Sequence, residues 1–301
     1  MQINILFEDV YVIIVNKPNN VLVHNSYYAR NIKDKTLLQL LFEQTGNNFY
    51  PVHRLDRKTS GVMLLAKNKT DVSKLQELFN SNQIQKTYVA IVRGYVEAKK
   101  IIESPVKNPD TGIYKEALTH CFPILKKELP IAVHPYENSR YSLVKLIPKT
   151  GRMHQLRIHM NKISRPIVGD YKYGDRFHNR NFETNFNCNN MFLHASILEF
   201  THPFTNEIIN FATSLCSRFF KSNILGIVLK LEKSTISRNL KRLLDRKLIK
   251  KESGQIIKIT YTGKLLLEQI IPEWEKAKME AKQVLKKEGE AALNILADNL
   301  I

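Results

Sequence analysis

The sequence is poor in cysteine and has no metal-binding spacing. Its three cysteines, Cys121, Cys188 and Cys216, lie far apart, and no CxxC pair is present. This spacing excludes a disulfide framework and is typical of thiols in a reducing compartment. The nine histidines are scattered without an HExxH or zinc-finger spacing, so we expect no metal site.

Long apolar runs and a leader segment are also missing. No stretch approaches the roughly 18 uncharged apolar residues that a membrane-spanning helix needs. The first residues, MQINILFEDVYVIIVNKP, contain Glu8 and Asp9 and lack a basic start and a small-residue cleavage site. They do not predict a signal peptide. We therefore expect a soluble, cytoplasmic protein with no membrane partner.

Several catalytic signatures are absent. The sequence has no GxSxG elbow, no GxxxxGK[ST] loop and no GxGxxG loop. What it has in excess is positive charge, with 46 lysines and arginines against 28 acidic residues. A net charge of +18 indicates a polyanionic partner. Residues 213–301 hold 18 of the basic and 10 of the acidic residues, so both halves of the chain are basic.

The hydrophobic pattern divides the chain near residue 213. Short β-branched or apolar runs predict strands within 4–24 (with a turn at 16–20) and at 62–66, 86–94, 139–151, 192–204 and 207–212. Apolar positions at helical spacing predict helices at 36–44, 70–80 and 153–163, the second capped by Thr70. Interleaved strands and helices predict an α+β domain over 1–212. From about 218 the chain is helix-like and more highly charged, which predicts a second domain over 213–301.

One carboxylate has an unusual setting. In HRLDRKTSG (53–61), Asp56 stands between Arg54 and Arg57 and precedes a Thr-Ser-Gly turn and an apolar strand. Nearby cations favour the ionised, nucleophilic form of an aspartate. No second acidic residue has a comparable setting, which argues against hydrolysis by a carboxylate pair. From the residues alone, Asp56 is either a reactive carboxylate or half of a structural ion pair.

The motifs of the first 212 residues resemble those of RluA-type pseudouridine synthases, and most closely the TruC type. The matching segments are FEDVYVIIVNKPNNVLVH, HRLDRKTSG, KTYVAIVRG, PKTGRMHQLRIHM, RPIVGDYKYG and LHASILEFTHPFT, in this order. The resemblance implies a catalytic domain with a mixed, mainly antiparallel sheet. It also implies isomerisation of a specific uridine in RNA to pseudouridine without cofactor or metal. The expected substrate is a uridine of the tRNA acceptor stem, with ribosomal RNA as the alternative.

The resemblance assigns roles to individual residues. Asp56 is expected to act on the glycosidic bond, and Tyr88 to stack on the uracil and help take up the C5 proton. Arg157 is expected to pair with Asp56. Arg54 would enter the RNA helix where the uridine is flipped out. The residues expected to contact the RNA backbone are Lys86, Arg152, Lys172 and Arg176.

Each of these residues also has a structural alternative. Tyr88 could be a core aromatic residue, Arg157 a solvated charge, and Arg54 a plain phosphate contact. The two histidines near Arg157, His154 and His159, are more typical of packing or hydrogen-bonding residues than of ligands.

The C-terminal part resembles a shortened MarR-family winged helix-turn-helix domain. STISRNLKRLLDRKLI (234–249) matches the recognition helix of that family, and KKESGQIIKITYTG (250–263) matches its two-stranded wing. The N-terminal helices of such regulators have no room between residues 212 and 218. The resemblance implies DNA as a further partner, and a DNA-binding regulator with a non-catalytic RNA-binding front domain as the alternative function. The candidate DNA contacts are Ser237, Arg238, Lys241 and Arg242.

Overall fold

A computed structural model describes residues 1–25, 34–108, 111–213, 245–246, 249–251 and 257–259. The chain forms two compact units, residues 1–229 and 230–301, and each is described by itself. Among the described residues, no helix has the length and apolar content needed to span a membrane.

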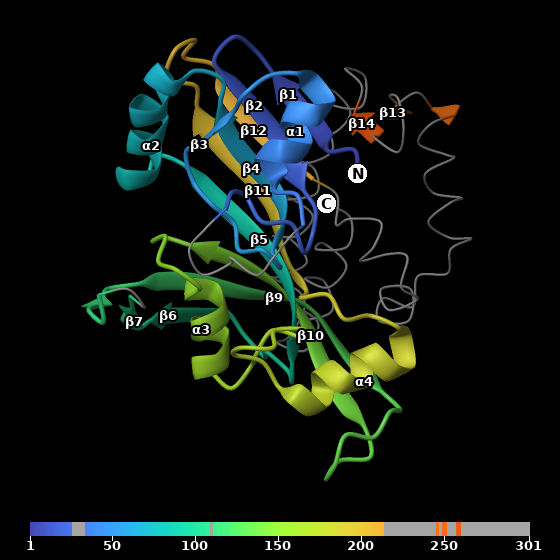
Figure 1. The fold of residues 1–301 in the computed structure, drawn as a ribbon. Helices are drawn as coiled ribbons and strands as arrows, with labels where there is room; N and C mark the ends of the chain where they lie inside the picture. Colours follow the sequence, from blue (N-terminus) through green and yellow to red (C-terminus); the bar gives the residue numbers. More distant parts are fainter. Residues whose placement is uncertain (26–33, 109–110, 214–244, 247–248, 252–256, 260–301) are drawn as a thin grey trace. The chain divides into compact units, whose positions relative to one another are not determined.

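The first unit is built on a ten-stranded sheet (Figure 1). Eight strands follow one another across it: β1 (Asn4–Glu8), β2 (Val12–Lys17), β4 (Ser60–Ala66), β11 (Leu193–Thr201), β5 (Gln85–Arg93), β10 (Ser139–Pro148), β9 (Leu118–Leu129) and β6 (Lys100–Glu103). In addition, β12 (Ile208–Ala212) pairs with β11 and β3 (Tyr50–Pro51) with β4, while β7 (Val106–Lys107) and β8 (Tyr114–Lys115) pair separately. The pairings are antiparallel except that of β4 with β11, which confirms the prediction of a mixed, mainly antiparallel sheet.

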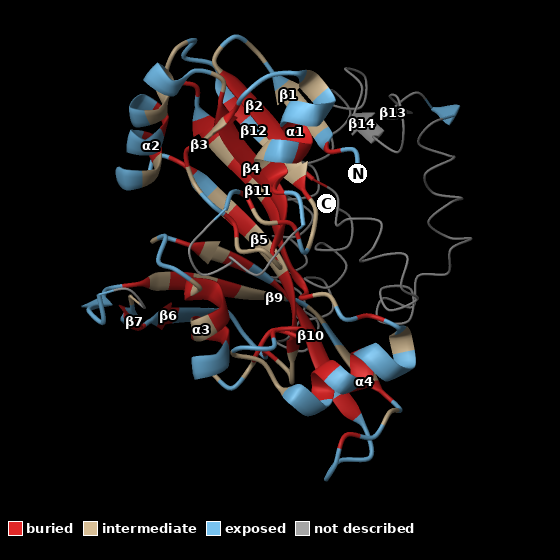
Figure 2. Ribbon diagram, viewed as in Figure 1, coloured by how far each residue is buried: buried red, intermediate tan, exposed pale blue. Residues whose placement is uncertain are grey.

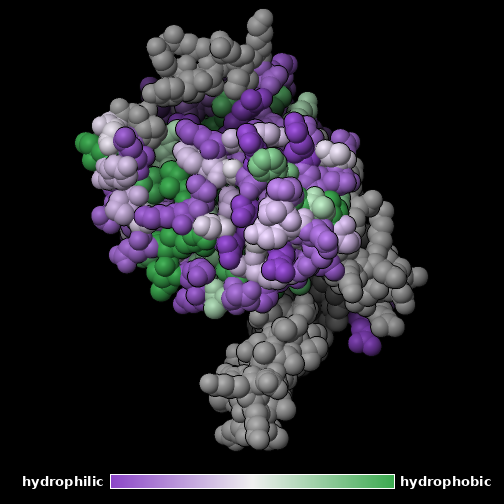
Figure 3. All heavy atoms as spheres, turned by 90° about the horizontal axis from the view of Figure 1, so that it is seen from below, coloured by the Kyte–Doolittle hydropathy of each residue, from purple (hydrophilic) through white to green (hydrophobic). Residues whose placement is uncertain are grey.

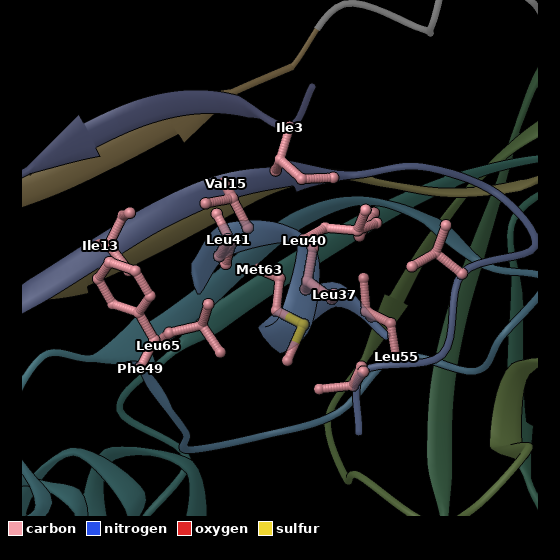
Figure 4. Packing of buried hydrophobic residues seen from close by; sticks show 13 residues of the cluster. Ile3, Ile13, Val15, Leu37, Leu40, Leu41, Phe49, Leu55, Met63 and Leu65 are labelled. Atoms are coloured by element: carbon pink, nitrogen blue, oxygen red, sulfur yellow. The ribbon is translucent and has the colours of Figure 1, made fainter. Parts of the chain in front are cut away.

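Two helices cover opposite faces of the strands near the N-terminus. The alternation of side chains along β2 sends Ile13 and Val15 to one face, where they pack with α1 (Leu37–Thr45). The intervening Val12 and Ile14 pack on the other face with α2 (Val72–Asn80). Figure 4 shows the first of these clusters, in which Met63 and Leu65 of β4 face Leu37 and Leu41 of α1.

Helix α1 has strong end signals. The side chain of Thr36 accepts a hydrogen bond from the backbone N–H of Gln39, and the Gln39 side chain accepts one from the backbone N–H of Thr36. This capping box satisfies amides that the helix itself leaves unpaired. Gly46 ends the helix in the left-handed conformation. The helix predicted at 36–44 is therefore confirmed.

The other half of the sheet is also covered by two helices. Leu156 and Met160 of α3 (Gln155–Lys162) pack with Ala90 and Val92 of β5. On the opposite side of the strand, Ile91 packs with Phe182 of α4 (Arg176–Phe186). Figure 2 shows that burial follows this plan, because the buried residues lie along the strands and on the inner faces of the helices. Figure 3, a view from below, shows a largely hydrophilic face with hydrophobic residues gathered toward one side.

Some predicted elements are wrong. A turn does follow β2 at 19–20, within the predicted 16–20, but residues 21–24 form no strand. A further bend at 10–11, not predicted, separates β1 from β2, and Asp9 accepts hydrogen bonds from two backbone amides there. Thr70 does not cap α2, since a short 3-10 turn (Lys69–Asp71) precedes that helix. The sequence reading also missed α4 and β9.

In the second unit the described residues form one strand pair. Strands β13 (Ile249–Lys251) and β14 (Ile257–Ile259) pair antiparallel. They lie in the segment predicted to form a two-stranded wing, except that β13 begins at Ile249, the last residue of the predicted recognition helix. Most of the predicted recognition helix, including Ser237, Arg238, Lys241 and Arg242, lies outside the described residues.

Candidate active site

Asp56 lies in the loop between β3 and β4, and side chains from the end of β2 and the turn after it bond to the backbone of this loop. The side-chain nitrogen of Lys17, which is fully buried, lies within hydrogen-bond distance of the carbonyl oxygens of Pro18, Val21 and Arg57, at 2.8–3.1 Å. The side chain of Asn19 donates to the carbonyl oxygen of Lys58. These bonds connect the turn after β2 directly to the residues that follow Asp56, so the carboxylate sits on a fixed backbone.

The carboxylate of Asp56 faces a buried arginine. Its Oδ2 atom accepts a hydrogen bond of 2.8 Å from Nη1 of Arg157. The same guanidinium donates from Nε and Nη2 to the two carboxylate oxygens of Asp170, at 2.7 and 2.8 Å. Asp170 is 1% exposed and also accepts from the backbone amides of Lys172 and Tyr173. Arg157 therefore has one side fixed by Asp170 and presents the other to Asp56.

The charges in this cluster reinforce one another. Burial acts to raise the pKa of Asp170, but the Arg157 guanidinium and two backbone amides outweigh it and bring that pKa below its ordinary value. Burial likewise acts to lower the pKa of Arg157, and Asp170, then Asp56, raise it above its ordinary range. Arg157 is thus a permanent positive charge beside Asp56.

A cavity of about 470 Å³ opens above this cluster. Of the eight residues predicted for the site, six line it: Arg54, Asp56, Lys86, Tyr88, Arg152 and Arg157. They come from three segments, the loop before β4, strand β5 and the segment that runs from β10 into α3, which the sheet brings together through the order β4-β11-β5-β10. Lys172 and Arg176 lie outside this lining and are exposed, Arg176 over the ring of Phe177.

Tyr88 lies half-buried on β5 in the wall of the cavity. Burial raises the pKa of its hydroxyl well above the ordinary value, and the negative charge of Asp56 raises it further. The ring contacts both the α1 cluster and the α3 cluster, so Tyr88 is at once a packing residue and a cavity wall.

The cavity lining also contains a stacked pair of rings, Phe79 and His53. The ring of Phe79, from α2, stacks on His53 at 4.4 Å between centroids. His53 Nε2 accepts a hydrogen bond from the backbone N–H of Leu64. Burial, then the charge of Lys86, lowers the pKa of His53 to about 3, so this imidazole is neutral at physiological pH.

Sequence reasoning missed Lys17, Asp170 and Tyr173. Asp170 stands inside the segment GDYKYG, of which only Lys172 was predicted to have a role, as a contact to the RNA backbone. A glycine-aspartate pair followed by alternating tyrosines gave a signal for a turn, but nothing in it pointed to Arg157. Lys17 follows a hydrophobic run and precedes a proline, and nothing in this pattern indicates that the lysine is buried.

Comparison with known proteins decides the family. A family model described as RNA pseudouridylate synthase matches residues 11–162. A tRNA pseudouridine synthase C from Pasteurella multocida is 42% identical over 219 residues, covering 69% of this chain and 90% of the relative. The protein of that name from Vibrio cholerae is 39% identical, covering 68% and 88%.

This chain belongs to the RNA pseudouridylate synthase family. It is accordingly an RNA pseudouridine synthase, an isomerase that converts uridine to pseudouridine. Among solved structures, human RNA Pseudouridylate Synthase Domain Containing 1 has the same fold, with a TM-score of 0.57 at 23% identity over 80% of this chain and 95% of that one. Human RNA Pseudouridylate Synthase Domain Containing 4 matches with a TM-score of 0.55 at 25% identity, over 73% and 92%.

Proposed function

We propose that this pseudouridine synthase modifies a uridine of the tRNA acceptor stem, and that Asp56 is its catalytic carboxylate. The observation that carries the proposal is the placement of Asp56 on a fixed loop, in ion contact with Arg157, inside a cavity that Tyr88 also lines. Relatives named tRNA pseudouridine synthase C support tRNA as the substrate.

The reaction needs a base that leaves the sugar and returns. The bond between N1 of uracil and C1′ of ribose breaks, the base turns, and a bond between C5 and C1′ forms. The C5 proton is released and N1 takes up a proton, so substrate and product are isomers. Asp56 acts at C1′, and Arg157 orients its carboxylate. Tyr88 packs against the detached base and helps the C5 proton leave.

The target uridine has to leave its helix to reach the cavity. Arg54 is exposed at the cavity and takes the place that the base vacates. Lys86 and Arg152 line the same cavity and contact the phosphates, and Lys172 and Arg176 extend the contact outside it. Basic residues of this kind supply affinity that falls with salt.

Tritium release tests the proposal. Transcripts of tRNA labelled at uridine C5 should lose tritium with the intact chain, and the loss should stop with Asp56→Asn, which keeps the side-chain shape. Pseudouridine mapping should then place the product in the acceptor stem. If the intact chain released tritium only from ribosomal RNA, the tRNA proposal would fail.

We further propose that the catalytic domain comprises residues 1–212. A MarR-like DNA-binding role for residues 213–301 remains a prediction, as does the alternative of a regulator with a non-catalytic front domain. Tritium release that depends on Asp56 would exclude that alternative, whatever the C-terminal part binds.

A further inference from the structure

His154 lies next to Asp56 in an uncommon backbone conformation. It is the N-cap residue of α3, with φ at +57°, in the left-handed region. A residue other than glycine held there costs on the order of 1–3 kcal/mol and is a feature of functional sites. His154 lines the cavity, and its side chain is 14% exposed.

One nitrogen of His154 is held and the other faces the carboxylate. Its Nδ1 atom lies 3.1 Å from the hydroxyl of Tyr173, within hydrogen-bond distance. Its Nε2 atom lies 3.7 Å from Oδ1 of Asp56. That separation is too long for a direct hydrogen bond. Because Arg157 holds Oδ2, the Oδ1 atom is the one Asp56 oxygen that these contacts leave for a substrate.

The second histidine of α3 shows what a structural histidine looks like here. His159 is fully buried, with Nδ1 at 3.0 Å from the Thr119 hydroxyl and Nε2 at 2.9 Å from the Ser104 carbonyl oxygen. Both of its nitrogens have protein partners. His154 differs because its Nε2 atom faces Oδ1 of Asp56 inside the cavity. The two atoms are 3.7 Å apart, too far for a direct hydrogen bond, so a third group can bond to both.

Ribose has a group that fits between the two atoms. The 2′-hydroxyl is attached to the carbon next to C1′, so a ribose placed with C1′ at Asp56 brings this hydroxyl beside the same carboxylate. A hydroxyl donates one hydrogen bond and accepts others. A hydroxyl oxygen placed beside the line that joins Nε2 of His154 and Oδ1 of Asp56 can lie about 2.8–3.0 Å from both atoms, which is hydrogen-bond distance.

We propose that the 2′-hydroxyl of the target nucleotide donates to Oδ1 of Asp56 and accepts from Nε2 of His154, and that His154 thereby selects ribose over deoxyribose. This inference rests on the proposed action of Asp56 at C1′. It fits a general rule, because the 2′-hydroxyl is the group by which a protein distinguishes RNA from DNA at a given site.

The protonation of His154 suits this role. Its surroundings contain both signs of charge, with Asp56 and Asp170 against Arg157 and Lys172. Burial has the largest effect and lowers the pKa of His154 below its ordinary value, although the two carboxylates act to raise it. A neutral imidazole that accepts from the Tyr173 hydroxyl at Nδ1 carries its proton on Nε2, which is the donor the proposal requires.

The test is a double-mutant cycle between protein and substrate. After the target uridine is mapped, the full chain and His154→Asn are assayed on RNA carrying either uridine or 2′-deoxyuridine there. Asparagine tolerates the left-handed backbone and is too short to replace Nε2. The control substrate has its deoxy sugar at the next nucleotide, and the control variant is His120→Gln, outside the cavity lining.

Each single change should lower kcat/KM by about 10–100-fold, the range expected for one hydrogen bond to a charged or polar partner. Both changes together should cost little more than either alone, because they remove the same interaction. His154→Gln, which restores an N–H at a similar reach, should recover part of the discrimination. Multiplicative losses, or equal activity of the wild type on both sugars, would overturn the inference.

A second variant covers the case in which His154→Asn does not fold. Tyr173→Phe keeps the imidazole and removes the hydroxyl at Nδ1, so the preference for ribose should shrink while His154 stays in place. An unchanged preference in Tyr173→Phe would contradict the proposed role of that hydroxyl. Absence of tritium release from ribose RNA by the wild type would instead defeat the proposed function, so the two failures are distinguishable.

Discussion

Asp170 shows how a residue outside the reaction can set the position of the one that reacts. It touches Arg157 through two hydrogen bonds, and Arg157 in turn touches Asp56. An arginine beside a single carboxylate would be free to turn about its bonds. Held in a fork by Asp170, it keeps one Nη atom on Asp56.

Replacement of Asp170 by asparagine should therefore reduce kcat by at least about 10-fold with little change in KM for tRNA. It should also destabilise the first unit by about 3–5 kcal/mol, since it removes one member of a buried ion pair. Tritium release and chemical unfolding measure the two effects. Asp175→Asn is the matched control, because Asp175 pairs with Arg93 outside the cavity lining and asparagine can still cap α4.

Lys17 gives a prediction for pH. Burial, with a smaller contribution from Arg57, lowers its pKa from 10.5 to about 7, while Asp56 acts in the opposite direction. Between pH 7 and 10.5 the unfolded chain binds this proton and the folded chain does not, so stability rises with pH in this window. Relative to Lys17→Met, the wild type should become steadily more stable from pH 7 to 10. A constant difference in unfolding midpoint across these pH values would contradict the shift.

The helices and strands that could be predicted are those whose type and ends are determined by residues within the same short segment. Helix α1 has its caps and its apolar stripe in one short segment, and β4 is an uninterrupted apolar run between a turn and a lysine. Helix α4 was missed because eight of the eleven residues in RFHNRNFETNF are polar. Its stability comes from the packing of Phe182 with Ile91, from the Asp175 cap and from Asn179, which is buried and bonded to Gly169 and Asp170.

Strand β9 was missed for a different reason. Pro123 stands in its middle, and proline in a strand normally argues against one. The structure places Pro123 where the register between β9 and β10 shifts, at a bulge. Bulges are the positions at which a sheet tolerates proline, so the long strand continues past it.

The contact of β4 with β11 depends on a glycine. Gly61 has φ of +117°, and a Cβ atom there would lie 2.1 Å from the carbonyl oxygen of Ala195. Gly61→Ala should destabilise the first unit by more than about 3 kcal/mol or prevent folding, as strain and overlap with backbone combine. Gly46→Ala is the control: its φ is also positive, but no atom lies within 4 Å of the added Cβ, so it should cost about 1 kcal/mol. Equal losses, measured by urea unfolding, would contradict the packing argument.

At the scale of the whole molecule, the net charge of +18 led us to expect a basic site, and the cavity has basic residues in its lining. Which basic residues meet there depends on segments that lie far apart in the chain. The six predicted residues that meet at the cavity were found through motif resemblance. Periodicity alone could not have joined them, because their proximity depends on the strand order of the sheet.

The C-terminal boundary can be tested by truncation. Thr213, just past β12, is buried, and its hydroxyl lies 2.9 Å from Nε2 of His194. A chain that stops at 213 should keep tRNA activity if residues 1–212 contain the whole site. A chain that stops at 212 should be less stable by about 1–3 kcal/mol, since it loses a buried hydrogen-bond partner. Loss of activity in both shortened chains, with both folded, would show that the C-terminal part contributes to catalysis or RNA binding.

The pairing of β4 with β11 also has a consequence for biosynthesis. Ser60, at the end of the loop that carries Asp56, is bonded to His194, which is 134 residues further along the chain. At roughly 5–20 residues per second, a ribosome needs on the order of 10 s to make the intervening segment. During that interval Ser60 and Gly61, the residues of β4 that later pair with β11, have no partner strand on that edge, because β3 pairs there only with Leu65 and Ala66. This stretch of the nascent chain is therefore an unpaired strand edge, at which another chain can pair. Because Leu193 of β11 also lines the cavity, the active site is completed only late in translation.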